Sequence, residues 1–178
     1  MNETIIIGMS GGVDSAVAAS ILIQDGYNVE ALFMKNWDED DKEFCTATKD
    51  YKDALQVCDK LNIPLRSIDL TKEYWDKVFK IFLKECEIGR TPNPDIICNR
   101  EIKFRAFLDY ATNLGANKIA TGHYAKIKKQ NGLYHLLRGE DKSKDQSYFL
   151  YRLDQSQISK SIFPLEKVNK KNVRKIAD

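Results

Sequence analysis

The first hydrophobic residues of the chain predict a buried strand that leads into a helix. Thr4–Gly8 is a β-branched run without polar alternation, which is typical of a parallel strand covered on both faces. From Asp14 to Asp25 the apolar residues recur at helical spacing, and Gly26 is a typical stop. A turn of small residues joins the two predicted elements.

Apolar strands and amphipathic helices continue to alternate as far as residue 121. The predicted elements after the first helix are three strands and three helices: strands at Val29–Met34, Pro64–Leu70 and Lys118–Thr121, and helices at Tyr51–Leu61, Lys72–Glu85 and Glu101–Leu114. A break is expected at Gly89–Asn99 and a mobile surface loop at Lys35–Asp50, which contains four consecutive acids. The βαβαβα order favours the α/β class with a doubly wound parallel sheet.

The pattern changes after Gly122. The predicted elements there are a hairpin with an Asn-Gly turn, two short helices and a last helix without a stop signal: Ala125–Lys129 with Leu133–Leu137, the surroundings of Tyr148 and Ile158, and Asn169–Ala177. We therefore expect a parallel-sheet domain at residues 1–124 and a small hairpin and helical extension at residues 125–178.

The composition of the chain predicts where the protein is located in the cell. The chain of 178 residues is 43% hydrophobic and 30% charged, as in a globular domain, and has neither an apolar run of membrane-spanning length nor a signal segment. A cytoplasmic location is expected. The spacing of the four cysteines predicts free thiols and no metal site, since it contains no CxxC pair: Cys45, Cys58, Cys86 and Cys98. Cys58 and Cys86 lie on apolar helix faces, which predicts that they pack as small hydrophobic residues.

Charge is distributed unevenly. Residues 126–178 carry 13 of the 28 Lys and Arg residues and 6 of the 26 Asp and Glu residues, a net charge of +7, so residues 1–125 have a net charge of −5. Such a basic region is either a solvated face or a docking surface for a polyanion.

The turn after the first strand has the composition of an anion-binding loop. In the run Gly8–Ser15, Gly11 and Gly12 can take positive φ and admit a ligand to the backbone, while the following helix presents unpaired N–H groups. Ser10 and Ser15 add hydroxyl donors. The run lacks the lysine of a Walker loop and the GxGxxG pattern of dinucleotide-binding proteins. A tight turn without a ligand is the alternative.

A second group of candidate residues precedes the helix predicted at Glu101. Cys98 would lie beside the N–H groups of that helix, and Arg100 and Lys103 would add positive charge, so we expect Cys98 to have the lowest pKa of the four thiols. It is either a nucleophile or a buried cysteine. Asp95 is a candidate acid or base that Asn93 could hydrogen-bond, although both residues also suit a turn.

Further candidates follow strand ends or lie in the basic region. Gly122 and His123 follow the fourth strand, where Gly122 would admit a nucleotide and His123 is more typical of a structural residue. Met34 would either cover an adenine or pack in the core. Lys144–Phe149 combines a cation, an amide and two aromatic rings, which suits an unpaired RNA base or a solvated helix start.

Six motifs together resemble the tRNA-specific 2-thiouridylase family nearly from end to end: GMSGGVDSAV, ALFMKNW, GRTPNPDIICNREIKF, ATGHYA, KDQSYFLY, and FPL followed by VRKIA. The resemblance implies an ATP pyrophosphatase fold of the adenine nucleotide alpha hydrolase type. It implies an ATP site, with Mg²⁺ accompanying ATP, at Gly8, Met9, Ser10, Gly11, Gly12, Val13, Asp14, Ser15, Met34 and Gly122. It further implies target-base contacts at Asn93, Pro94 and Asp95, catalysis by Cys98 and Asp95, and tRNA contacts at Lys144, Asp145 and Gln146.

The implied reaction activates the C2 oxygen of the wobble uridine as an adenylate and then replaces it with sulfur, releasing AMP and pyrophosphate. Its partners are tRNA, at the anticodon region, and a protein that donates persulfide sulfur. The family continues into a central and a β-barrel domain and has a second cysteine beyond the last predicted helix, so we expect an N-terminal portion. The alternatives are an ATP pyrophosphatase that acts on a small molecule and a noncatalytic module that binds nucleotide and tRNA.

Overall fold

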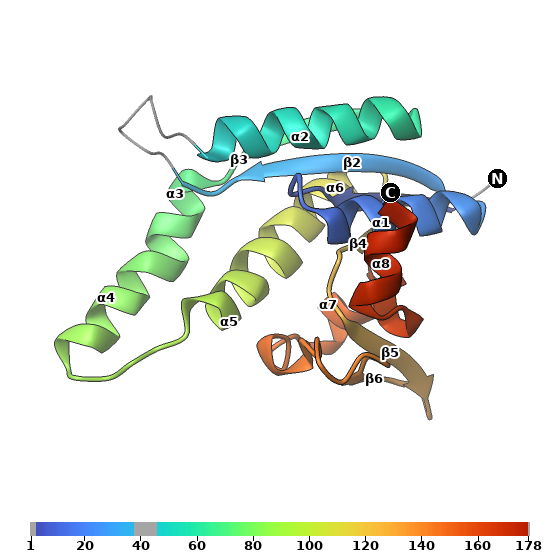
Figure 1. Cartoon of the computed structure of the whole chain (residues 1–178). Coiled ribbons are helices and arrows are strands. Elements are labelled where there is room, and N and C mark those ends of the chain that lie inside the picture. Colours follow the sequence, from blue (N-terminus) through green and yellow to red (C-terminus); the bar gives the residue numbers. More distant parts are fainter. Residues whose placement is uncertain (1–2, 38–45, 178) are drawn as a thin grey trace.

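The computed structural model describes residues 3–37 and 46–177, and within them it confirms the doubly wound α/β fold (Figure 1). Five parallel strands form the main sheet in the spatial order β3-β2-β1-β4-β7. Their bounds are β1 (Thr4–Gly8), β2 (Asn28–Lys35), β3 (Leu65–Asp69), β4 (Lys118–Ala120) and β7 (Ser161–Ile162). The order reverses between β1 and β4, and such reversals create a crevice at the carboxyl edge of a sheet.

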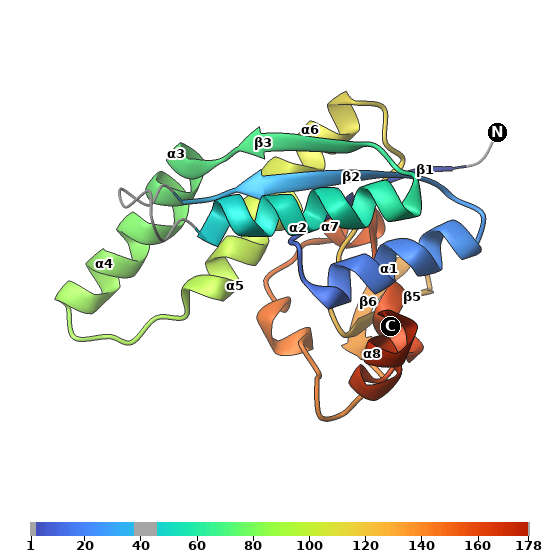
Figure 2. The same cartoon turned by 45° about the horizontal axis from the view of Figure 1, so that its top comes forward.

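Helices pack on both faces of this sheet. The bounds of the α-helices are α1 (Val13–Gln24), α2 (Thr46–Leu61), α3 (Thr71–Tyr74), α4 (Lys80–Glu87), α5 (Pro94–Cys98), α6 (Phe107–Asn113), α7 (Gln155–Ser159) and α8 (Lys170–Ala177). Two π-helical segments, η1 (Trp75–Phe79) and η2 (Asn99–Ala106), connect α3 to α4 and α5 to α6, and two 3₁₀ turns are η3 (Ser147–Phe149) and η4 (Pro164–Lys167). In Figure 2, α1 and α2 lie on the same side of the sheet.

Alternate side chains of β1 enter the two halves of the core. Ile5 and Ile7 are fully buried against residues of α1, α2 and α8, whereas Ile6 packs on the opposite face with Phe104 and Phe107. Continuous burial on both faces is the reason why the strand contains no polar alternation. The sheet thereby holds the end of β1 between two helical layers.

The part of the chain after residue 124 forms the predicted hairpin and one strand that was not predicted. β5 (Ala125–Gln130) and β6 (Leu133–Arg138) are antiparallel, and both turn residues, Asn131 and Gly132, have positive φ. β7 pairs in parallel with β4, so this part of the chain also extends the main sheet. Two residues are too short a run for hydrophobic alternation to indicate a strand. The division at residue 124 stays a prediction.

Two predicted boundaries are wrong. The helix expected from Glu101 begins at Pro94, within the expected break, because the Asn93 side chain accepts a hydrogen bond from the Asp95 N–H at 3.0 Å and Pro94 occupies the first helical position. α2 begins at Thr46, inside the expected surface loop. The acidic run of that loop and Cys45 lie outside the described residues.

The turn between β1 and α1 is fixed by close packing of backbone. Gly11 has a φ of +76°, and a Cβ atom there would lie 2.5 Å from the carbonyl oxygen of Asp50. Gly12, in contrast, has a φ of −82°, so the expectation of positive φ is met at Gly11 alone of the two. A Cβ atom on Gly122 would lie 2.9 Å from the backbone of Asp14. The start of α1 is therefore held between α2 and the segment after β4.

We predict that Gly11→Ala destabilises the chain more than Gly89→Ala. Both glycines have a φ of +76°, but nothing lies within 4 Å of a Cβ atom on Gly89. Strain alone should cost about 1–2 kcal/mol at Gly89, and the clash with Asp50 should add to it at Gly11. Urea unfolding of the two variants measures the difference, and equal losses would contradict the packing described.

Candidate functional site

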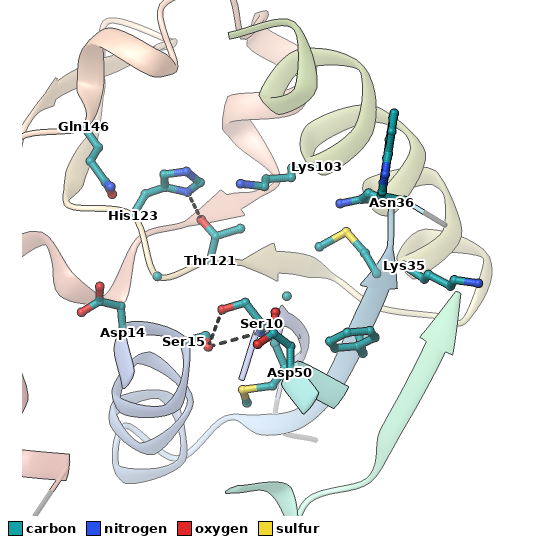
Figure 3. A pocket seen from close by; sticks show the side chains of 16 residues that line it. Ser10, Asp14, Ser15, Lys35, Asn36, Asp50, Lys103, Thr121, His123 and Gln146 are labelled. Carbon is teal, nitrogen blue, oxygen red and sulfur yellow. Dashed lines mark hydrogen bonds between the residues drawn. The ribbon is translucent and has the colours of Figure 1, made fainter. Parts of the chain in front are cut away.

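A cavity of about 480 Å³ opens at the carboxyl edge of the sheet (Figure 3). Its walls are the ends of three strands, the start of α1 and one side of η2. The lining residues there are Gly8–Ser10 at the end of β1, Met34–Trp37 at the end of β2, Thr121–His123 after β4, Asp14 and Ser15 on α1, and Lys103 on η2. Phe33, Asp50 and Gln146 complete the lining. The cavity thus lies at the crevice that the strand order creates.

The loop on its floor keeps its shape through its own hydroxyl groups. The Ser15 hydroxyl donates to the Gly12 carbonyl at 2.8 Å and lies 3.2 Å from the Ser10 hydroxyl, while the Ser10 N–H donates to Ser15 Oγ at 3.3 Å. The N–H groups of Gly11 and Val13 have no acceptor among residues 3–37 and 46–177. Unpaired N–H groups at a helix start form a site for an anion.

Asp14 is held by two donors from distant parts of the chain. The Tyr124 hydroxyl donates to its Oδ1 at 2.7 Å, and the Lys170 ammonium on α8 lies 2.6 Å from the same oxygen. Burial and the bond to the Asp14 carboxylate raise the pKa of Tyr124, so the phenol stays protonated as a donor. The contact joins the start of α1 to the last described helix.

The segment after β4 forms the wall opposite α1. Gly122 lines the cavity. The close approach of the α1 backbone is enough to explain why this residue is a glycine, without reference to a ligand. His123 Nδ1 lies 2.8 Å from the Thr121 hydroxyl, and the ring packs near those of Phe104 and Phe163. Burial, with a smaller effect of Lys103, lowers the pKa of His123 to about 3, so its imidazole is neutral at physiological pH.

The two candidate methionines, Met9 and Met34, lie in different places. Met9 is 1% exposed and belongs to the core beneath the loop, although part of it lines the cavity. Met34 is half-buried in the cavity wall, where its Cε atom would be 3.2 Å from a Cβ atom on Gly8. It also packs against the apolar cluster that contains Cys98, a residue that does not itself line the cavity.

The expectation of a lowered pKa at Cys98 is wrong for the described structure. Cys98 is the last residue of α5 and continues directly into η2, so it does not lie at a helix start. It is 9% exposed among Ile97, Ile102 and Val78, and this burial raises its pKa, although Lys103 acts in the opposite direction. Arg100 is bound to the neighbouring Glu101.

The other two described cysteines differ in burial. Cys58 is buried as expected, and burial raises its pKa to about 11. Cys86 is exposed, contrary to the expectation of an apolar contact, because the face of α4 that carries it has no covering element among the described residues.

Asn93, Pro94 and Asp95 do not line the cavity. Asn93 caps α5 through its side chain, which is the turn role left open by the sequence, and Asp95 is exposed on the first turn. Tyr74, on α3, was not singled out from the sequence. Burial together with the nearby Cys98 and Asp95 raises the pKa of Tyr74, so these three groups lie close together.

Of the segment Lys144–Gln146, one residue reaches the cavity. Gln146 lines it and accepts a hydrogen bond from the Tyr124 N–H at 3.1 Å. Asp145 accepts from the Ser147 N–H at 3.0 Å and lies 3.4 Å from Arg138, while Lys144 is exposed. The segment therefore connects the cavity to the basic surface of the C-terminal part.

Sequence reasoning missed Tyr124 and Lys170, which bind Asp14, and several lining residues: Phe33, Lys35, Asn36, Trp37, Asp50 and Lys103. For Lys103, the sequence gave one signal, its position five residues after Cys98. We interpreted this lysine only as a positive charge near the helix start expected after Cys98. Within the described ranges, no group of three His, Cys, Asp or Glu residues could hold a metal ion, and no helix is long and apolar enough to cross a membrane.

Comparison with known proteins places this fold and site in a family. The model of the tRNA methyl transferase HUP domain matches residues 3–178. The chain belongs to this family. Two curated relatives are each called tRNA-specific 2-thiouridylase MnmA. The relative from Nitrosomonas europaea is 59% identical over 99% of the chain, and the relative from Streptococcus pyogenes serotype M1 is 57% identical over 98% of the chain. The chain spans 49% and 47% of their lengths, about half of each.

A solved structure supports the fold. The U34-tRNA thiolase NcsA from Methanococcus maripaludis, solved with its 4Fe–4S cluster, superimposes with a TM-score of 0.58 at 19% sequence identity. The match covers 99% of this chain and 55% of that one. The resemblance to the 2-thiouridylase family stated from the sequence motifs is confirmed by the relatives.

We predict that Cys86 is alkylated before Cys98 and Cys58 in the folded chain. Cys86 is exposed, whereas burial shields both other thiols and raises their pKa values, so less thiolate is available at them. Iodoacetamide labelling at pH 8, followed by peptide mapping, gives the order. Labelling of Cys98 first would show that its thiol is more accessible than the structure indicates.

Proposed function

We propose that the chain binds ATP in the cavity and contributes to the ATP-dependent 2-thiolation of a tRNA wobble uridine. The observation that carries this proposal is the start of α1 at the reversal of the strand order, where Asp14 and Ser15 line the cavity and their N–H groups have no acceptor among the described residues. A polyphosphate supplies the negative charge that this helix start favours. The relatives called 2-thiouridylases support the choice of reaction.

The cavity suggests how the nucleotide lies. The β- and γ-phosphates would contact the loop Ser10–Ser15, and the adenine would lie toward Met34 at the end of β2. Gln146 and His123 would then face the middle of the nucleotide. The neutral imidazole of His123 would add no charge there.

Mg²⁺ fits this arrangement as a companion of the phosphates. Asp14 Oδ1 is occupied by Tyr124 and Lys170, and Oδ2 has no hydrogen-bond donor among the described residues. A single carboxylate oxygen together with phosphate oxygens is an ordinary environment for Mg²⁺. Bound there, the ion would neutralise charge on the departing pyrophosphate.

Thiolation would proceed in two displacements. The uridine O2 attacks the α-phosphorus, the bond to pyrophosphate breaks, and the base becomes an adenylate. The terminal sulfur of a persulfide, supplied by a donor protein, then attacks C2, and the C2–O2 bond breaks as AMP leaves. The Cys98 thiolate would attack the donor's sulfur in the C2–S–S adduct, so that the S–S bond breaks, one sulfur stays on C2 and a disulfide joins Cys98 to the donor. Asp95, which lies close to Cys98, and Asn93 would meet the base outside the cavity lining, and Cys98 would act from the apolar cluster against which Met34 packs. Access to Cys98 requires displacement of its apolar neighbours, which we assign to tRNA docking.

We predict that Asp14→Ala lowers the rate of tRNA-dependent pyrophosphate release from ATP by about 100-fold or more, since it removes the carboxylate at the phosphate site. Asp109→Ala, at an exposed position of α6 outside the cavity, is the matched control and should retain the rate. The assay uses the protein with an unmodified tRNA transcript. Equal rates for Asp14→Ala and Asp109→Ala would overturn the assignment of the cavity.

We also predict that an anticodon stem-loop binds the chain through its basic part and that the affinity falls steeply between 50 and 200 mM salt, as phosphate contacts release counterions. Lys144→Ala should weaken RNA binding without changing ATP affinity, because Lys144 is exposed outside the cavity. Lys84→Ala on α4 serves as the control. Fluorescence anisotropy measures both, and an affinity independent of salt would contradict the electrostatic docking.

A further inference from the structure

Lys103 is a cation in the cavity wall without a carboxylate partner. Two lysines line the cavity, and the ammonium of Lys35 lies 3.9 Å from a carboxylate oxygen of Asp69. No carboxylate oxygen in the described part of the chain lies within ion-pair distance of the half-buried Lys103. Partial burial of an unpaired ammonium is unfavourable, so the position suits an anionic ligand.

The direction of the side chain supports this interpretation. Figure 3 shows Lys103 extending from its helix toward His123, on the wall that faces Ser10 across the cavity. Its charge contributes to lowering the pKa of His123 and acts to lower that of Cys98, so the ammonium is close to both groups. Lys103 therefore lies in the cavity wall near His123 and also close to the buried thiol.

The π-helical geometry of η2 brings about this placement. In an α-helix, residues five apart point in directions about 140° apart. The wider i→i+5 turn of a π-helix returns position i+5 toward the side of position i, and such segments are frequent at functional sites. Cys98 immediately precedes η2 and Lys103 lies five residues later. The π-helix thus brings Lys103, which lines the cavity, toward the side of the helix that carries Cys98.

We propose that Lys103 is a residue of the nucleotide site and that its ammonium contacts the α-phosphate of bound ATP. This inference rests on the proposed function. With the outer phosphates at Ser10–Ser15 and the adenine toward Met34, the α-phosphate is the anionic group nearest to the wall that carries Lys103. The cation would stabilise charge on the α-phosphate when the uridine O2–P bond forms and pyrophosphate leaves. It would stabilise the same phosphate when AMP leaves from C2.

The nucleotide contact is tested by calorimetric titration of the chain with adenosine, AMP and ATP. Lys103→Met, which keeps the length of the side chain and removes its charge, should weaken AMP and ATP binding about tenfold to hundredfold and leave adenosine binding unchanged. Lys103→Arg should retain most of the affinity for AMP. Lys80→Met, which removes a lysine paired with Asp76 outside the cavity, is the control for loss of charge.

Unchanged adenosine affinity also reports that the variant is folded. An AMP affinity equal to that of the unaltered chain would overturn the inference while leaving the proposed ATP site in place. If the unaltered chain does not bind ATP, the proposed function is overturned, and the inference with it.

A second readout tests the position of Lys103 relative to Cys98. The charged or titratable groups that act on this thiol are Lys103, Asp95 and Tyr74. Removal of the ammonium should shift the pH profile of Cys98 alkylation to higher pH in Lys103→Met, whereas Lys103→Arg and Lys80→Met should leave the profile in place. A profile that does not move in Lys103→Met would contradict the close approach of the two groups.

Discussion

The meeting of three backbone segments at the end of β1 is the constraint on which the site depends. The turn at Gly11 packs against the carbonyl of Asp50, and Gly122 packs against the first turn of α1, in both cases at distances that exclude a Cβ atom. Because no side chain separates these segments, the start of α1 lies directly at the reversal of the strand order. Its free N–H groups therefore open into the cavity.

A second set of contacts ties the C-terminal part of the chain to this point. Lys170 and Tyr124 converge on Asp14, Gln146 binds the backbone beside Tyr124, and β7 extends the sheet next to β4. Ion pairs between half-buried groups are sensitive to their surroundings. An RNA that docks on the basic C-terminal part would thus act close to the groups that hold Asp14 at the start of α1.

The sequence was sufficient for the elements whose signals are local and repeated. The β-branched run of β1, the apolar face of α1 and the Asn-Gly turn of the hairpin each depend on neighbouring residues, and the structure confirms them. It was insufficient for β7, because two residues carry no periodicity and the strand forms only through its pairing with β4. The start of α5 was misread although Asn93 and Pro94 form a typical helix start.

For the site, the sequence predicted the glycine-rich loop and the strand ends that surround the cavity, because parallel strands bring their carboxyl ends together. It misplaced Cys98, since the pKa of a thiol depends on burial by residues distant in sequence and not on its neighbours alone. Lys170 was missed because 156 positions separate it from Asp14. The contact of Tyr124 with Asp14 and the position of Lys103 in the cavity wall likewise depend on tertiary packing and not on local sequence.

The central claim is that the open helix start at Gly11–Ser15 receives the phosphates of ATP. It is tested most directly by a crystal structure of the chain with a non-hydrolysable ATP analogue. The account predicts that the β- and γ-phosphates lie within hydrogen-bond distance of the N–H groups at the start of α1, with the adenine toward Met34. An analogue bound elsewhere at saturating concentration, with this loop empty, would contradict it.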